Sequence, residues 1–162
     1  MLALRGGGPE ALIPAFPPEV VARMVRHLEA TWPHEGCGVI LQEGAGQGGA
    51  WRVVLLPNAS PTPRVAYAFA PEAWLQVCLD AEARGETVAC VFHSHVDAAA
   101  VFSAEDRRQA APEGVPLLPH VSYVVIAIHR GRVDSASQSK WLGDGFQTVP
   151  LTVPDFRFEK PV

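Results

Sequence analysis

The apolar run of residues 87–92 is the feature of this sequence that most constrains its fold. A short run without polar alternation is typical of a strand that is buried on both faces of a sheet. The run ends at His93-Ser94-His95, where polar side chains replace apolar ones. We therefore predict a central strand with two histidines at the point where it leaves the sheet, which is where loops usually build functional sites.

The remaining sequence alternates between strand-like and helix-like patterns. A second central strand is expected over residues 121–129, and helices are expected where prolines open or end periodic apolar patterns. The other predicted strands are 37–41, 51–56 and 65–69, with edge strands at 135–142 and 146–153; the predicted helices begin at 17–18, at 71 and at 103–106. These elements predict an α/β fold, with a mixed and mainly β core on which helices pack.

The length of 162 residues suits one compact domain, and the hydrophobic content of 48% is enough to form its core. Residues 1–14 are rich in Gly and Pro and are expected to form a flexible N-terminal arm. The domain is expected to span residues 15–155, and residues 156–162 to form a C-terminal tail. No internal repeat or second domain boundary is visible in the sequence.

Charge and cysteine usage exclude several classes of protein. The net charge is −4 and no run of Lys and Arg forms a basic stripe, so no nucleic-acid partner is expected. No apolar stretch approaches the roughly 20 residues that span a membrane, and the N-terminus lacks a signal-peptide layout. Three cysteines without a C-x-x-C pair argue against a disulfide scaffold or a zinc finger. A cytoplasmic protein without a membrane partner is expected.

The two histidines have the spacing of a metal site. Residues i and i+2 of a strand point to the same side, so His93 and His95 can direct both imidazoles to one point. Neutral imidazoles are good zinc ligands, and a carboxylate from Asp106 would complete a catalytic set of three protein ligands. Asp97 is a competing carboxylate, but it follows His95 too closely to be arranged easily with both rings. We therefore predict a zinc ion bound by His93, His95 and Asp106.

Ser103 and Asp106 also have a simpler interpretation. Their S-x-x-D spacing is that of a capping box, in which the serine caps a helix and the acidic side chain reaches back to it. The two interpretations are compatible, because a helix start would hold Asp106 rigidly and a metal ligand needs a fixed position.

The motif His93-Ser94-His95, followed by Ser103 and Asp106, resembles the JAMM motif of the MPN-domain metalloproteases. That family also has an upstream glutamate, which lies just after the first helix in a context similar to E-x-C-G.

This chain has Glu35-Gly36-Cys37-Gly38 at the corresponding place, and residues 120–128 resemble the family's next central strand. The resemblance covers about residues 17–142. Many members have proline where this chain has Val96 and Phe102, so the loop between them is expected to differ in shape or mobility.

The resemblance implies a cytidine-deaminase-like MPN domain with a zinc cofactor. By position, His93, His95 and Asp106 would be its ligands. Glu35 would accept a proton from water and deliver it to the leaving amine, and Ser103 would donate a hydrogen bond to the oxyanion. The implied activity is that of a metallopeptidase.

The resemblance also implies a partner. The substrate would be a peptide or isopeptide bond after the C-terminal Gly-Gly of a ubiquitin-like protein, either a sulfur-carrier protein or a bacterial ubiquitin-like modifier. Two alternatives are a noncatalytic MPN-like scaffold that binds ubiquitin-like proteins, and a RadC-type protein.

Other polar residues near the motifs have simpler interpretations. Cys37 could be a redox thiol or an extra ligand, but a small buried residue in a strand is favoured. His34 could line the mouth of the site and His120 could approach it. A surface position is favoured for His34, and a hydrogen-bonded structural role for His120.

Overall fold

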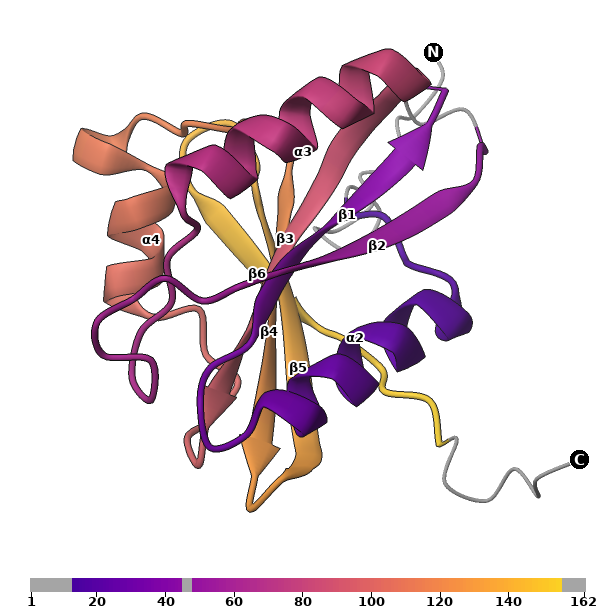
Figure 1. The fold of residues 1–162 in the computed structure, drawn as a ribbon. Helices are drawn as coiled ribbons and strands as arrows, with labels where there is room; N and C mark the ends of the chain where they lie inside the picture. The colour runs from indigo at the N-terminus through magenta and orange to yellow at the C-terminus, as the bar shows by residue number, and fades with distance from the viewer. Residues whose placement is uncertain (1–12, 45–47, 156–162) are drawn as a thin grey trace, which may run out of the picture.

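A computed structural model of the chain describes residues 13–44 and 48–155 (Figure 1). Six strands form one sheet in the order β2-β1-β3-β4-β5-β6. The strands are β1 (Cys37–Glu43), β2 (Trp51–Leu56), β3 (Glu86–Val96), β4 (Ser122–His129), β5 (Arg132–Trp141) and β6 (Phe146–Pro150). The helices are α2 (Pro18–Thr31), α3 (Pro71–Arg84), α4 (Ala104–Ala110) and the 3-10 turn η1 (Pro112–Gly114). The predicted α/β fold is confirmed.

The centre of the sheet is the parallel pair β3 and β4, and the other neighbouring pairs are antiparallel. A parallel pair cannot be joined by a tight turn, so the chain must cross over one face of the sheet between these strands. The crossover contains α4 and η1. The crossover therefore places α4 on the face of the sheet toward which Val91 of β3 projects.

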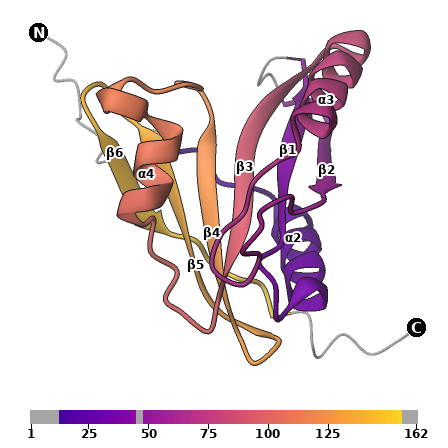
Figure 2. The same cartoon turned by 60° about the vertical axis from the view of Figure 1, so that its left-hand side comes forward.

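Helices cover both faces of the sheet (Figures 1 and 2). On one face, α2 packs against a core that includes Ile40, Phe92 and Val124. On the other face, α3 and α4 cover a second core that includes Val91 and Val125. The neighbouring residues Val91 and Phe92 thus belong to opposite cores, as the period of two along a strand requires.

The first two helices begin where the sequence predicts. Pro18 lies in the first turn of α2, where its missing N–H has no partner to lose, and Met24, Val25 and Leu28 of this helix are fully buried. Gly85 ends α3 with a φ of 67° and donates its N–H to the carbonyls of the last turn. A left-handed φ of this kind favours glycine.

The prediction of a strand over residues 65–69 is wrong. This stretch is irregular because the Asn58 side chain bonds its backbone: Nδ2 donates to Ala66 O (2.9 Å), and Oδ1 accepts from Ala68 N (3.1 Å). Ala59 N also donates to Ala68 O (2.8 Å). The segment therefore satisfies its polar groups locally instead of joining the sheet.

Two strand predictions need a smaller correction. Residues 135–142 were expected at an edge, but β5 pairs with β4 on one side and with β6 on the other. The central strand β3 extends to Val96, so His93 and His95 lie inside the sheet, paired with Val125 and Ala127 of β4, and not beyond the strand's end.

The predicted terminal arms lie almost wholly outside the described residues. Of the arm predicted over residues 1–14, Ile13 and Pro14 are described; Ile13 is 5% exposed and Pro14 O accepts a bond from Gln138. The predicted tail at 156–162 is not described, and the boundaries of the domain stay a prediction. Within the described part of the chain, no helix is long and apolar enough to cross a membrane.

We predict that Gly38→Ala lowers the free energy of unfolding by about 1–3 kcal/mol, because overpacking a filled core forces its neighbours to move. A Cβ at Gly38 would lie 2.6 Å from Phe92 Cζ and would also collide with Val54 O. The matched control is Gly145→Ala, since a Cβ there meets nothing within 4 Å. Urea unfolding of both variants measures the difference, and equal stabilities would contradict the packing described for β1.

Candidate metal centre

Three side chains converge on the α3/α4 face of the sheet. Asp106 Oδ1 lies 3.3 Å from His93 Nε2, and Asp106 Oδ2 lies 3.3 Å from His95 Nε2. One ligand atom from each residue lies within 4.8 Å of the others. The structure thus brings together the three residues that the sequence predicts as metal ligands, two from β3 and one from the start of α4.

The strand period places the two histidines on the same face and Ser94 on the other. Ser94 is fully buried, and its Oγ accepts a hydrogen bond from Gly36 N at 2.8 Å. Its backbone N–H in turn donates to Gly36 O at 3.0 Å. Ser94 therefore points away from the site and links β3 to the segment that follows Glu35.

Asp106 is fixed by the capping box at the start of α4. Ser103 Oγ accepts from Asp106 N (3.0 Å), and Asp106 Oδ2 accepts from Ser103 N (2.9 Å). Burial raises the pKa of Asp106, but the two imidazoles and the Ser103 N–H outweigh burial and hold it well below its usual range. The carboxylate is therefore ionised at neutral pH, as a metal ligand must be.

Phe102 anchors this helix start to the core. It is 3% exposed, stacks on Tyr123 with ring centroids 5.4 Å apart, and meets Phe146 edge-on at 5.0 Å. The Phe102 carbonyl accepts from Arg107 Nε at 3.3 Å, and the guanidinium lies 5.5 Å from the ring centroid. Aromatic packing thus fixes the chain at Phe102, the position at which many MPN-domain metalloproteases have proline.

The second ring nitrogen of His95, Nδ1, forms a hydrogen bond with the backbone. Nδ1 lies 2.8 Å from the carbonyl of Ala99, which can only accept, so Nδ1 carries a proton, and Nε2 presents a lone pair when the ring is neutral. Burial lowers the pKa of His95, but the nearby Asp106 and Ala99 outweigh it and raise the pKa above its usual value.

His93 is 1% exposed, and burial lowers its pKa, so its imidazole is neutral at pH 7. Within the described part of the chain, neither of its ring nitrogens has a hydrogen bond; Nε2 faces Asp106 without the required geometry. A buried polar nitrogen without a partner is costly. Two imidazoles and a carboxylate form a donor set that suits zinc once His95 has lost its extra proton, and a metal at this point would satisfy His93 Nε2.

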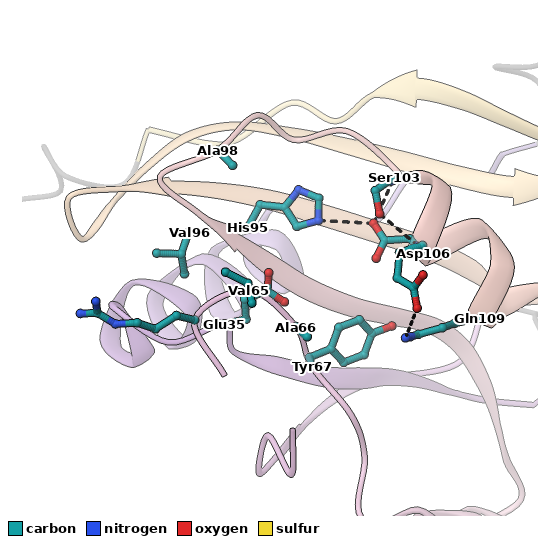
Figure 3. A pocket seen from close by; sticks show the side chains of 12 residues that line it. Glu35, Val65, Ala66, Tyr67, His95, Val96, Ala98, Ser103, Asp106 and Gln109 are labelled. Atoms are coloured by element: carbon teal, nitrogen blue, oxygen red, sulfur yellow. Dashed lines mark hydrogen bonds and ion pairs between the residues drawn. The ribbon is translucent and has the colours of Figure 1, made fainter. Parts of the chain in front are cut away.

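Glu35 lines a pocket of about 260 Å³ beside this centre, together with Tyr67, His95, Ser103 and Asp106 (Figure 3). Glu35 is 6% exposed, and burial raises its pKa to about 7; the charge of His95 lowers the pKa and that of Asp106 raises it further. A carboxyl group with a pKa near neutrality can both accept and return a proton, which is what general acid–base catalysis requires.

Ser103 lies at the pocket with its hydroxyl proton available. Its Oγ already accepts from the Asp106 N–H, so the hydroxyl proton is free to point toward a ligand. Figure 3 shows Ser103 and His95 on either side of the Asp106 carboxylate.

The other candidate residues lie elsewhere. Asp97 Oδ1 accepts from Arg130 N at 2.7 Å and does not belong to the ligand group. Cys37 is fully buried, and its pKa is raised to about 12 by burial and by the charge of Glu35, so its thiol is protonated. His34 and His120 are exposed and line pockets other than the one beside the metal centre.

Tyr67 and Asn58 are the site residues that sequence reasoning missed. Tyr67 lies over His93 with ring centroids 4.2 Å apart, but the alternation around it resembles a strand and gives no sign of this role. Asn58 had a usable signal: an asparagine after proline often bonds the backbone two residues on, and its Oδ1 accepts from Ser60 N at 3.0 Å.

A scan of family models matches residues 17–140 to the family described as prokaryotic homologs of the JAB domain. This match spans the first five strands, the helices and the metal centre. The chain belongs to the prokaryotic JAB-domain family. Membership confirms the resemblance to JAMM and MPN-domain proteins.

Two named proteins are similar to this chain in sequence. One, from Thermus thermophilus, is named "Probable TtuB-protein conjugate cleaving protease" and is 32% identical over 104 residues, 64% of this chain and 68% of its own length. The other, from Haloferax volcanii, is named "Desampylase" and is 31% identical over 124 residues, 75% of this chain and 79% of its own length.

Solved structures share the fold of this JAB-domain chain. A protein from Desulfitobacterium hafniense superposes with a TM-score of 0.64 at 24% identity, covering 83% of this chain and 88% of its own. A protein from Salinibacter ruber superposes with a TM-score of 0.60 at 24% identity, covering 92% and 95%. Both likenesses concern the fold.

We predict that Glu35→Gln stabilises the metal-free protein more at high pH than at low pH. The unfolded glutamate loses its proton near 4.5, whereas the folded one keeps it to about 7. The wild type therefore loses stability as the pH rises through this window, and the neutral glutamine does not. Urea unfolding with chelator at about pH 5 and about pH 8 measures this. An equal difference between variant and wild type at both pH values would show that Glu35 is not desolvated.

Proposed function

We propose that this JAB-domain chain is a zinc-dependent hydrolase that cleaves a peptide or isopeptide bond after the C-terminal Gly-Gly of a ubiquitin-like protein. The observation that supports this proposal most strongly is the convergence of three donor atoms within 4.8 Å beside a buried glutamate. His93, His95 and Asp106 would hold the ion. When bound, zinc would supply a Lewis acid that polarises the substrate carbonyl and acidifies water.

Glu35 acts as the proton carrier of the reaction. Its carboxylate accepts a proton as water attacks the carbonyl carbon, and it returns that proton to the amine as the C–N bond breaks. The products are a carboxylate at the end of the ubiquitin-like protein and a free amine. The raised pKa of about 7 in the metal-free chain supports this role, because it makes both directions of transfer accessible near neutrality.

Ser103 and the capping box stabilise the charge that develops on the carbonyl oxygen. The Ser103 hydroxyl donates to this oxyanion while its oxygen continues to accept the Asp106 N–H. Since Asp106 accepts the Ser103 N–H in return, the hydrogen-bond donor and the carboxylate ligand keep a constant separation.

Two features support a protein conjugate as the substrate. The pocket of about 260 Å³ is lined by Glu35, His95 and Asp106, so a bond held there lies beside both the proton carrier and the proposed metal. The names of the two curated relatives, a conjugate-cleaving protease and a desampylase, support the removal of one protein from another.

A noncatalytic scaffold remains an alternative, as does a RadC-type protein. The complete donor set and the buried Glu35 argue against a scaffold, because binding alone would not need a carboxyl group buried beside a metal site.

We predict that the purified protein binds one zinc ion and that His95→Ala loses it, because the two remaining donors cannot fill a three-ligand site. Atomic emission after dialysis measures the zinc content. The matched control is His120→Ala, an exposed histidine outside the centre. A wild type that retains no zinc would contradict the proposed cofactor.

We predict that the zinc-loaded wild type cleaves a ubiquitin-like carrier whose terminal Gly-Gly is joined to a lysine side chain. Glu35→Gln is expected to keep its zinc and to lower kcat by about 10²–10⁴-fold, the usual contribution of a positioned general base. Mass spectrometry of the released carrier measures the site and the rate of cleavage.

The control for this experiment is Glu82→Gln, an exposed glutamate on α3. It is expected to match the wild type. Near-normal turnover by Glu35→Gln would show that another group moves the proton, and cleavage at positions other than the terminal Gly-Gly would show a different substrate.

A further inference from the structure

Among the described residues, no group makes the hydrogen bond to His93 Nδ1 that normally supports a metal-binding histidine. Such a ring usually donates its second nitrogen to a carboxylate, a carbonyl or water, and this bond fixes the angle at which the other nitrogen faces the metal. His95 follows this pattern, with Nδ1 at 2.8 Å from Ala99 O. His93 Nδ1 is buried and has no hydrogen-bond partner within the described residues.

The contact that His93 has instead is a ring stack. The Tyr67 ring lies parallel to the imidazole within 22°, with centroids 4.2 Å apart. Tyr67 is partly buried and belongs to the apolar cluster on the α3/α4 face, so its own position is restricted. A stack of this kind restricts rotation of the imidazole, because a turned ring would collide with the Tyr67 ring.

The segment that contains Tyr67 is held to the site from both sides. The Asn58 side chain donates Nδ2 to Ala66 O (2.9 Å) and to Glu35 O (2.9 Å), and its Oδ1 accepts from Ala68 N (3.1 Å). One amide group thus bonds both neighbours of Tyr67 and the backbone of Glu35. These bonds also explain why residues 65–69 are not a strand: their irregular path places the Tyr67 ring against His93.

We propose that Tyr67 is a positioning residue that orients the His93 imidazole for metal binding by stacking, in place of the missing hydrogen bond to Nδ1, and that Asn58 holds Tyr67 there. This proposal rests on the metal site of the proposed function. In this proposal the aromatic ring of Tyr67 orients His93 and the phenolic hydroxyl does not. Tyr67→Phe and Tyr67→Leu are therefore expected to have different effects.

The test measures zinc affinity by competition with a chromophoric chelator in the wild type, Tyr67→Phe and Tyr67→Leu. Tyr67→Phe keeps the ring and is expected to bind zinc as the wild type does. Tyr67→Leu removes the stack and is expected to bind about tenfold more weakly, the lower end of the range for lost support of a ligand. The matched control is Trp74→Leu, which removes an aromatic ring from the same cluster at a residue that stacks on Phe69 and, among the described residues, has no ring contact with Tyr67 or His93.

A readout on the metal-free protein tests the stack without the ion. The His93 ring protons lie under the Tyr67 ring, so their NMR signals are expected to shift upfield in the wild type and in Tyr67→Phe. Asn58→Ala is expected to reduce both this shift and the zinc affinity. This variant also keeps the test decisive if Tyr67→Leu does not fold, which urea unfolding reveals.

The outcomes separate this proposal from the one on which it rests. A wild type that takes up no zinc overturns the proposed function. A wild type that binds zinc, with Tyr67→Leu and Asn58→Ala equal to it, overturns the positioning role alone. A loss in Tyr67→Phe equal to that in Tyr67→Leu assigns the effect to the hydroxyl and also overturns it, as does an equal loss in Trp74→Leu.

Discussion

The fixed position of the Asp106 carboxylate is the constraint on which the candidate site depends. One oxygen of this group accepts the Ser103 N–H that begins α4, and both oxygens face the imidazoles of β3. A carboxylate has about four acceptor positions, so it can cap a helix and bind a metal together. The anchor of this arrangement is apolar: Phe102 is buried among aromatic side chains immediately before the helix. The polar centre is thus placed by the same packing that forms the core.

Two carboxyl groups of the pocket, those of Asp106 and Glu35, have opposite electrostatic environments. The imidazoles and a backbone N–H hold the pKa of Asp106 well below its usual range, whereas burial raises that of Glu35 to about 7. Pairs of titratable groups whose surroundings separate their pKa values often divide the roles of a catalytic site between them. Here the permanently ionised member is suited to hold a cation and the other to exchange a proton. The difference arises from the number of donors around each group, since both are largely withdrawn from water.

Most of the fold and the main elements of the site could be predicted from the sequence, because they depend on patterns that are local or periodic. Two strands without polar alternation, helices opened by proline, and the i, i+2 spacing of His93 and His95 each follow from the geometry of one element. The errors concern residues whose placement depends on partners outside their own segment. Residues 65–69 alternate as a strand would, but Asn58 bonds their backbone and diverts them. The stack of Tyr67 on His93 joins positions 26 apart in the chain, and no local pattern records it.

The loop of residues 97–101, which joins the histidine strand to α4, contributes no side chain to the donor set. Its one bond to the centre comes from the carbonyl of Ala99, a group that any amino acid supplies. The side chains of this loop can therefore change during evolution without changing the donors of the metal site. Homologues with the same three donors can in this way differ in the substrates that they accept, through changes in the rim of the pocket alone.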